Sequence, residues 1–175
     1  MKLEPIVWFE EVVKTHQTIA PHIHHTQVVT CPDLNEELGG KYIFKPESLQ
    51  ITGSFKVRGA LSAISRLSKE QLKYGVVAYS SGNHAQGVAH AAKLFNTPAI
   101  VVMPKDAPVK KIENARTLGA EVVFYDRIKD SREQMAAEIA QEKNLTLIKP
   151  YDSLETIFGQ ATAAYEVIHD VNNPK

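Results

Sequence analysis

Residues 76–104 read VVAYSSGNHAQGVAHAAKLFNTPAIVVMP, and this stretch decides the fold. Two short apolar runs, 76–80 and 99–103, have the length and composition of buried strands. Residues 83–95 between them fit a helix. Strands joined by a helix in this way pair in parallel, with a right-handed crossover. The stretch therefore predicts a β-α-β unit.

The same alternation continues to residue 148. We expect a helix over 109–118, a strand over 121–125, a helix over 131–143 and a strand over 145–148. Pro108 suits a first helical turn, Gly119 suits the position just after a helix, and Ser131 opens the capping-box pattern SREQ. Together these elements predict an α/β fold in which helices cover both faces of an open parallel sheet, giving three layers.

The regular alternation of strands and helices suggests a division of the chain into domains. Residues 71–150 hold every strand of the predicted parallel sheet and form a small α/β domain. Residues 1–70 offer two helical stripes and one isolated strand at 41–45, while 151–175 offer a single helix. Because neither piece has an obvious core of its own, we expect both to belong to an incomplete second α/β domain. The alternative is that they cover one side of the parallel sheet.

Composition excludes several broad classes of protein. The 175 residues include 20 Lys and Arg against 20 Asp and Glu, so the chain lacks the basic excess of a nucleic-acid binder or of a protein held to an anionic membrane. No run approaches the ~18 apolar residues of a membrane span. Cys31 is the only cysteine, so no intrachain disulfide is possible and the cytosol is the expected compartment.

The string Ser80-Ser81-Gly82-Asn83-His84 falls between a predicted strand and a predicted helix. Ligands of open parallel sheets bind at this edge, where the first N–H groups of a helix are unpaired. Gly82 lets the backbone approach a ligand closely, and the serine hydroxyls can donate hydrogen bonds. The string therefore favours an anion such as a carboxylate. Taken alone, it is also compatible with an ordinary helix cap.

A second string, TGSFKVRGA at residues 52–60, places Lys56 between two glycines. It is not a phosphate-binding P-loop, whose lysine follows both glycines. A lysine can form an imine with a carbonyl once its ammonium, with an ordinary pKa of about 10.4, has lost a proton. Taken alone, Lys56 could equally be a solvated lysine at the start of a helix.

The two strings together carry a specific resemblance. Residues 45–60 (KPESLQITGSFKVRGA) and 80–87 (SSGNHAQG) strongly resemble the threonine dehydratase and serine racemase family of pyridoxal-phosphate enzymes, of fold-type II. Shorter family strings follow in the same order at 103–104, 110–111, 118–122, 131–133, 149–152 and 159–162. Two positions depart from the family pattern, Gln27 where proline is usual and Ala161 where glycine is usual, and neither is a catalytic position.

The resemblance implies a role for three residues toward the cofactor. Lys56 would hold pyridoxal 5'-phosphate as a Schiff base, and after its release it would remove the α-proton of the substrate. Phe55 would lie against the cofactor. Asn83 would donate a hydrogen bond to the phenolic oxygen of the cofactor ring.

The resemblance also implies a substrate site. Ser81, Gly82, Asn83 and His84 would bind the carboxylate of a small amino acid through backbone N–H groups and the serine hydroxyl. This agrees with the anion site that the helix start predicts on its own. In serine racemases a serine at the position of Ser81 also acts as an acid and base, so Ser81 is a second candidate catalytic residue.

The chemistry that these residues imply is an ammonia-lyase reaction of amino acid metabolism. A β-hydroxy amino acid would lose its α-proton and its hydroxyl, and the product would hydrolyse to a 2-oxo acid and ammonia. Threonine, serine and 3-hydroxyaspartate all qualify as substrates. Serine racemase activity is the alternative. A full-length enzyme of this kind is expected to be a homodimer.

In the family, further functional groups follow the part that this chain resembles. They are a glycine-rich loop for the cofactor phosphate, a residue at the pyridine nitrogen and, in some members, ligands for a divalent metal. The nine glycines here form no such loop. We therefore expect a truncated N-terminal fragment of the enzyme that binds the cofactor weakly. The alternative, from another class, is an inactive remnant or an interaction domain.

Three histidines near the N-terminus, His22, His24 and His25, raise the question of a metal site. A closed zinc site needs four ligands, and no cysteine or carboxylate accompanies these histidines at a suitable spacing. We expect them to be loop histidines and predict no metal site in this chain. The expected partner is a small amino acid, with neither nucleic acid nor membrane.

Overall fold

The computed structural model describes residues 5–172, so the outermost ends of the predicted second domain, 1–4 and 173–175, lie outside it. The first elements are α1 (Pro5–Ile19), the 3-10 turn η1 (Ala20–His22), β1 (Val29–Thr30), α2 (Pro32–Leu38), β2 (Ile43–Phe44), the 3-10 turn η2 (Glu47–Leu49), α3 (Lys56–Ser65) and α4 (Lys69–Tyr74). The remaining elements are β3 (Val76–Tyr79), α5 (Asn83–Leu94), β4 (Ala99–Pro104), α6 (Val109–Thr117), β5 (Glu121–Tyr125), α7 (Arg132–Glu142), β6 (Thr146–Leu147) and α8 (Leu154–Asn172).

Strands β3 to β6 form one parallel sheet in the order β5-β4-β3-β6. Val76 of β3 pairs with Ala99 of β4, and Val101 of β4 pairs with Val122 of β5. Every residue of the central strands β3 and β4 is buried, as expected for apolar strands that are covered on both faces. The predicted α/β fold with an open parallel sheet is confirmed.

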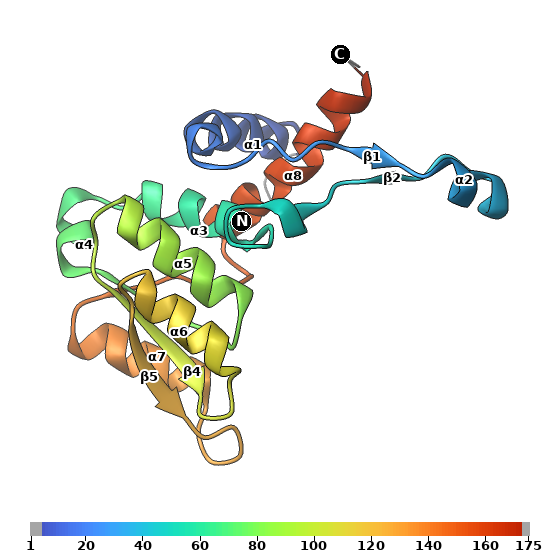
Figure 1. Cartoon of the computed structure of the whole chain (residues 1–175). Helices are drawn as coiled ribbons and strands as arrows, with labels where there is room; N and C mark the ends of the chain where they lie inside the picture. The colour runs from blue at the N-terminus through green and yellow to red at the C-terminus, as the bar shows by residue number, and fades with distance from the viewer. Residues whose placement is uncertain (1–4, 173–175) are drawn as a thin grey trace.

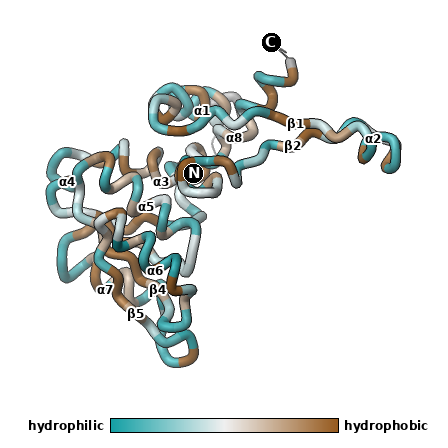
Figure 2. The backbone as a smooth tube through the Cα atoms, in the orientation of Figure 1, coloured by the Kyte–Doolittle hydropathy of each residue, from teal (hydrophilic) through white to brown (hydrophobic). Residues whose placement is uncertain are grey.

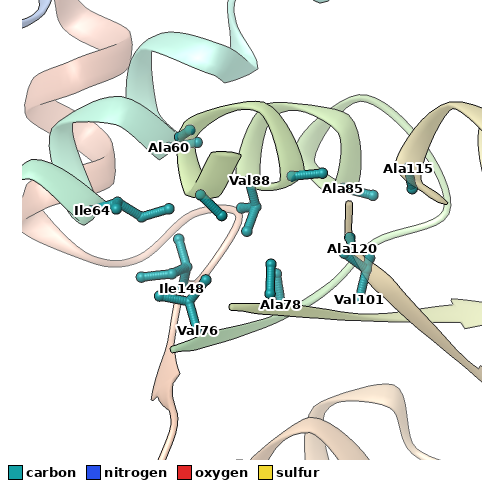
Figure 3. Close-up of a cluster of buried hydrophobic side chains, with 14 of the residues drawn as sticks. Ala60, Ile64, Val76, Ala78, Ala85, Val88, Val101, Ala115, Ala120 and Ile148 are labelled. Atoms are coloured by element: carbon teal, nitrogen blue, oxygen red, sulfur yellow. The ribbon is translucent and has the colours of Figure 1, made fainter. Parts of the chain in front are cut away.

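Helices cover both faces of this sheet. Because successive side chains of a strand point to opposite faces, Val76 and Ala78 pack toward α3 and α5 (Figure 3). Val77 and Val102 pack on the other face with Ala136 of α7. Full burial of one such valine contributes about 1.5–3 kcal/mol. The two cores therefore fix the three layers that the sequence predicts.

Helix α3 links this sheet to the remaining helices. It packs against α5 on one side and against α8 on the other, and α1 lies along α8 (Figure 1). All residues from 57 to 64 are buried.

No helix between residues 5 and 172 is long and apolar enough to cross a membrane. The division into domains at 1–70, 71–150 and 151–175 stays a prediction.

A narrow arm extends from the α1–α8 side of the molecule (Figure 1). Its antiparallel strands β1 and β2 pair Val29 with Phe44, and helix α2 lies at its tip. Both strands run brown in Figure 2 although Val29 is 49% exposed and Phe44 is 43% exposed. The expected strand at 41–45 is thus present as β2, whereas β1 and the seven-residue α2 are not predicted by the sequence pattern.

The helix starts differ from expectation in two places. Ser131 accepts a hydrogen bond from the backbone N–H of Gln134, but the Gln134 side chain donates to Glu138 instead of reaching back. The capping box predicted there is therefore only half formed. A complete capping box joins Ser68 and Gln71 at the start of α4, a helix that is not predicted.

Candidate active site

The turn between β3 and α5 lies at the carboxyl edge of the sheet. Gly82 is the N-cap residue of α5, and no side chain caps this helix. The Gly82 N–H donates to the Ser80 hydroxyl at 3.1 Å, which holds the turn closed. The first N–H groups of a helix have no partner within the helix. The start of α5 therefore presents unpaired donors to an anion.

Lys56 is the first residue of α3 and reaches the same place from across the chain. Its Nζ donates to the carbonyl oxygen of Pro150 at 2.9 Å, and Gln160 Nε2 donates to the same oxygen at 3.3 Å. The Nζ also lies 5.1 Å from the centroid of the Phe55 ring. Burial lowers the pKa of the Lys56 ammonium below its ordinary value. Less energy is then needed to obtain the neutral amine that forms an imine.

A cleft of about 360 Å³ joins these features. Lys56, Ser81, Gly82, Asn83 and His84 all line it. The structure thus brings together five of the six predicted site residues, while Phe55 touches the site through Lys56. A larger cleft of about 490 Å³ lies along the far end of α5 and touches none of them.

His84 is a deeply buried residue of the site. It is 2% exposed, and its Nε2 lies 3.0 Å from the carbonyl oxygen of Ile148. Because a carbonyl only accepts hydrogen bonds, Nε2 carries the proton and Nδ1 is left as an acceptor. Burial lowers the pKa of His84 to about 4, so the ring is neutral at neutral pH. Its Nδ1 is buried without a hydrogen-bond partner, which marks a place for a donor from a ligand.

Two basic residues in this cleft have no predicted role. Lys111 of α6 places its Nζ 3.5 Å from Asn83 Oδ1, and Arg132 of α7 holds its guanidinium 5.5 Å from the centroid of the Tyr79 ring. Since α6 and α7 lie on opposite faces of the sheet, the two cations flank the turn from both sides. Their positions at the starts of helices, after carboxyl ends of strands, are the signal that could have revealed them.

The N-terminal histidines have separate partners. His24 Nδ1 lies 3.2 Å from the carbonyl oxygen of Leu49, and His25 Nε2 lies 2.9 Å from Asp170. The His22 ring packs against Phe95. Within residues 5–172, no three His, Cys, Asp or Glu side chains come together as metal ligands.

The sequence profile of a family described as "Pyridoxal-phosphate dependent enzyme" matches residues 19–175. This chain belongs to that family. It is 47% identical to the L-threo-3-hydroxyaspartate ammonia-lyase of Pseudomonas sp over 160 residues, which are 91% of this chain and 50% of that protein. It is 40% identical to the L-threonine ammonia-lyase of Thermotoga maritima over 166 residues, 95% of this chain and 41% of that protein.

The fold is shared with solved members of the family. The structure of maize serine racemase superposes with a TM-score of 0.89 at 38% identity, over 94% of this chain and 50% of that one. The chain spans about half the length of the relatives that it matches. The family resemblance, the fold and pyridoxal phosphate as the family's cofactor are therefore confirmed.

The residues of the cleft fit this cofactor. Lys56 offers an amine for its aldehyde, and Asn83 offers an amide beside the uncapped start of α5. The buried Nδ1 of His84 offers an acceptor without a partner. An amine, an amide and a buried acceptor in one cleft are thus compatible with pyridoxal phosphate.

Proposed function

We propose that this chain carries the reactive lysine and the substrate site of an ammonia-lyase. The reaction converts a β-hydroxy amino acid to a 2-oxo acid and ammonia. The observation that supports the proposal is the meeting of Lys56 with the uncapped start of α5 in one cleft. The lyase names of two relatives agree with it.

Lys56 has two roles in this proposal, to hold the cofactor covalently and then to move a proton. Pyridoxal phosphate, when bound, supplies the electron sink for the α-carbon of the amino acid. The free Lys56 amine would then take the α-proton, and its lowered pKa keeps a larger share of the amine neutral. Phe55 would lie beside the cofactor, and Asn83 would orient it through its side-chain amide.

The substrate carboxylate binds at the start of α5 in this proposal. The backbone N–H groups of Ser81, Gly82, Asn83 and His84, with the Ser81 hydroxyl, supply the donors. The neutral His84 ring adds no charge there, so the helix N-terminus and neighbouring cations provide the positive potential.

The charge of the cleft favours a substrate with two carboxylates. Lys111 and Arg132 stand on either side of the turn, and none of the described residues that line the cleft is acidic. Arg132 donates to Glu133 through Nε, which leaves the hydrogens of both Nη atoms for a ligand. One α-carboxylate needs fewer cations than this. We therefore favour 3-hydroxyaspartate over threonine or serine.

Serine racemase activity is the second candidate. Ser81 lines the same cleft as Lys56, so its hydroxyl is available for a proton transfer in either reaction. A racemase returns the mirror-image amino acid, whereas a lyase releases ammonia.

The experiment that tests the proposed function traps the cofactor. The purified chain is mixed with pyridoxal phosphate, reduced with borohydride, digested and read by mass spectrometry. The proposal expects the label on the peptide of Lys56, and its loss in Lys56→Arg. Lys56-dependent exchange of the α-hydrogen of 3-hydroxyaspartate or serine in D₂O, followed by NMR, tests the proton transfer. Label spread evenly over the surface lysines would refute the proposal.

A further inference from the structure

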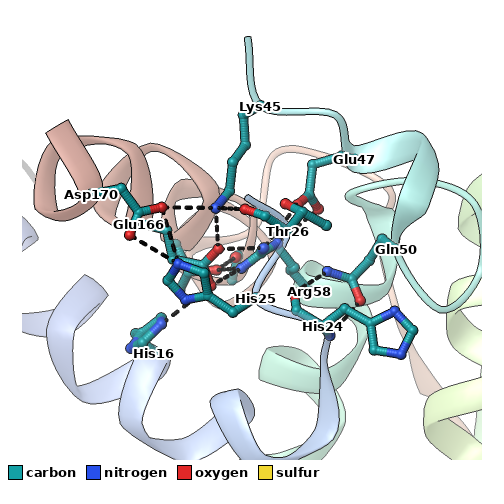
Figure 4. Close-up of polar contacts among 12 residues, drawn as sticks. His16, His24, His25, Thr26, Lys45, Glu47, Gln50, Arg58, Glu166 and Asp170 are labelled. Carbon is teal, nitrogen blue, oxygen red and sulfur yellow. Dashed lines mark hydrogen bonds and ion pairs between the residues drawn. The ribbon is translucent and has the colours of Figure 1, made fainter. Parts of the chain in front are cut away.

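Arg58 is completely buried, and each of its N–H groups has an acceptor (Figure 4). Nε and Nη2 donate to the two oxygens of Glu47, each at 2.8 Å. Nη1 and Nη2 donate to the two oxygens of Glu166, again at 2.8 Å. Nη1 also donates to Thr162 Oγ1 at 3.2 Å. A guanidinium has five N–H donors, so this one is saturated.

The charged cluster extends beyond Arg58. Lys45, whose side chain is 8% exposed, places its Nζ 2.7 Å from Glu166 and 3.5 Å from Asp170. His16 Nε2 lies 3.2 Å from Glu166. Burial raises the pKa of Glu166, but hydrogen bonds from Arg58 and Lys45 outweigh this effect and lower the pKa to about 2. The carboxylate therefore stays charged, and the cluster ties together α1, α3, α8 and the segment before α3.

Such a cluster contributes little net stability. Removing charges from water costs several kcal/mol per ion, and apolar residues of similar volume often serve the fold as well or better. What a saturated guanidinium adds is geometry, because two bidentate contacts fix both its position and its orientation. Here the fixed residue is Arg58, in the first turn of α3.

Arg58 and Lys56 lie on opposite sides of that turn. Residues two positions apart in the sequence, such as 56 and 58, are about 200° apart around an α-helix. Lys56 points to Pro150 in the cleft, whereas Arg58 points to Glu166 on α8. Neighbouring helices also approach the turn closely, since a Cβ on Gly87 of α5 would lie 3.1 Å from the carbonyl oxygen of Lys56. We therefore expect a shift of Arg58 to move Lys56 in the same first turn.

We propose that Arg58 is a positioning residue for Lys56. The guanidinium, held by Glu47 and Glu166, fixes the first turn of α3 so that the Lys56 amine stays in the cleft. Reactive groups must be held within about 0.5 Å of their productive place, and packed secondary structure does this better than loops. The inference deepens the proposed function, since it concerns the lysine that this function uses.

The test measures the Lys56 amine without any cofactor, so that its failure is distinct from a failure of cofactor trapping. The chain is labelled with trace acetic anhydride between pH 6 and 11, and each lysine peptide is read by mass spectrometry. For each lysine, the pH at which labelling reaches half its maximal rate is its midpoint. We expect the Lys56 midpoint to lie below those of exposed lysines in the natural chain. Arg58→Lys keeps the positive charge but loses the guanidinium that binds Glu47 and Glu166 together. In this variant we expect the Lys56 midpoint to rise. The reactivity of Lys56 at pH 8 then falls about threefold, as a half-unit rise in pKa requires.

A second variant separates geometry from charge. Glu47→Gln removes a negative charge, which by electrostatics alone would lower the Lys56 midpoint, whereas a loosened turn raises it. Arg116→Lys is the matched control, because Arg116 is exposed in the last turn of α6 and its guanidinium lies over the Phe124 ring, outside the cleft. It is expected to leave the Lys56 midpoint unchanged.

Circular dichroism and thermal unfolding show which variants are folded. A raised Lys56 midpoint in either folded variant supports the proposal. An unchanged or lowered midpoint in the folded variants overturns it. Unfolding of both variants would make the cluster a stability element alone and would also overturn it.

Discussion

Lys111 Nζ lies 3.5 Å from Oδ1 of Asn83, the first residue of α5. The N-terminus of a helix carries about half a positive charge, so a second positive charge beside it is unfavourable unless an anion lies close to both. Gly82 leaves room for this Nζ, since a Cβ there would lie 2.8 Å from it and would displace the flexible end of Lys111. The chain therefore concentrates positive potential at the place where the proposed carboxylate binds.

The first prediction concerns this potential. Lys111→Gln and Arg132→Gln are each expected to weaken the binding of malonate, a dicarboxylate, by roughly tenfold, because a hydrogen bond to a charged group contributes about 1.5–3 kcal/mol. Acetate, with one carboxylate, is expected to lose less in Arg132→Gln than malonate does. NMR titration of the amide signals of residues 80–84 gives both affinities.

The control for this prediction is Lys143→Gln, which removes one exposed cation that pairs with Glu121 at the start of β5, the opposite edge of the sheet. It leaves the malonate affinity unchanged if the effect is local. Equal losses of acetate and malonate affinity in Arg132→Gln would remove the case for a second carboxylate.

The second prediction concerns His84 and the stability of the fold at low pH. Its pKa is about 4 when folded, against about 6.5 when unfolded, so the unfolded chain binds the extra proton first. The stability that the neutral buried ring contributes is therefore complete above pH 6.5 and is lost as the pH falls toward 4. The difference corresponds to about 3 kcal/mol at most. Urea unfolding at pH 7 and at pH 5 measures it.

The matched variant is His84→Gln, because its amide can still donate to Ile148 while it does not titrate. The variant is expected to lose less stability than the natural chain between pH 7 and pH 5. Burial also lowers the pKa of His16 and His90, so some dependence on pH remains. An identical slope in both proteins would exclude His84 as the source of the effect.

The parallel sheet could be predicted from the sequence because its signals are local. Apolar runs such as 99–103 mark strands whose two faces are both buried, and the helices between them imply parallel pairing with right-handed crossovers. The arm could not be predicted in the same way. Helix α2 has no buried residue, so no apolar stripe marks it. Helix α4 does carry a local signal, the capping-box pattern of Ser68 and Gln71.

The site was predictable where it follows one segment and not where it joins several. Lys56 and the turn before α5 stand in continuous strings whose chemistry can be read directly. Arg132 enters the cleft only because the sheet order places α7 across from α6. The contact of Arg58 with Glu166 spans 108 positions of the chain, and no spacing rule reaches that far.

The third prediction tests the crossing of α3 and α8 at Gly159. A Cβ at this position would contact the carbonyl oxygen of Arg58, and it would lie 2.6 Å from Ser62 Cβ and 2.7 Å from Gly59 Cα. An alanine in place of a glycine within a helix normally stabilises it by up to about 1 kcal/mol. Here the backbone of α3 cannot move aside without disturbing the Arg58 cluster, so Gly159→Ala is expected to destabilise the chain by about 1–3 kcal/mol.

Urea unfolding measures this change, and Gly87→Ala is the comparison within a helix on the opposite side of α3. A Cβ on Gly87 would lie 3.1 Å or more from its neighbours, so a smaller loss is expected there. Gly159 touches Arg58, which lies in the same turn as Lys56. The pH midpoint of Lys56 labelling by acetic anhydride is therefore expected to rise in Gly159→Ala, as is expected for Arg58→Lys. A Gly159→Ala chain as stable as the natural one, with an unchanged Lys56 midpoint, would show that the α3–α8 crossing does not hold the lysine in place.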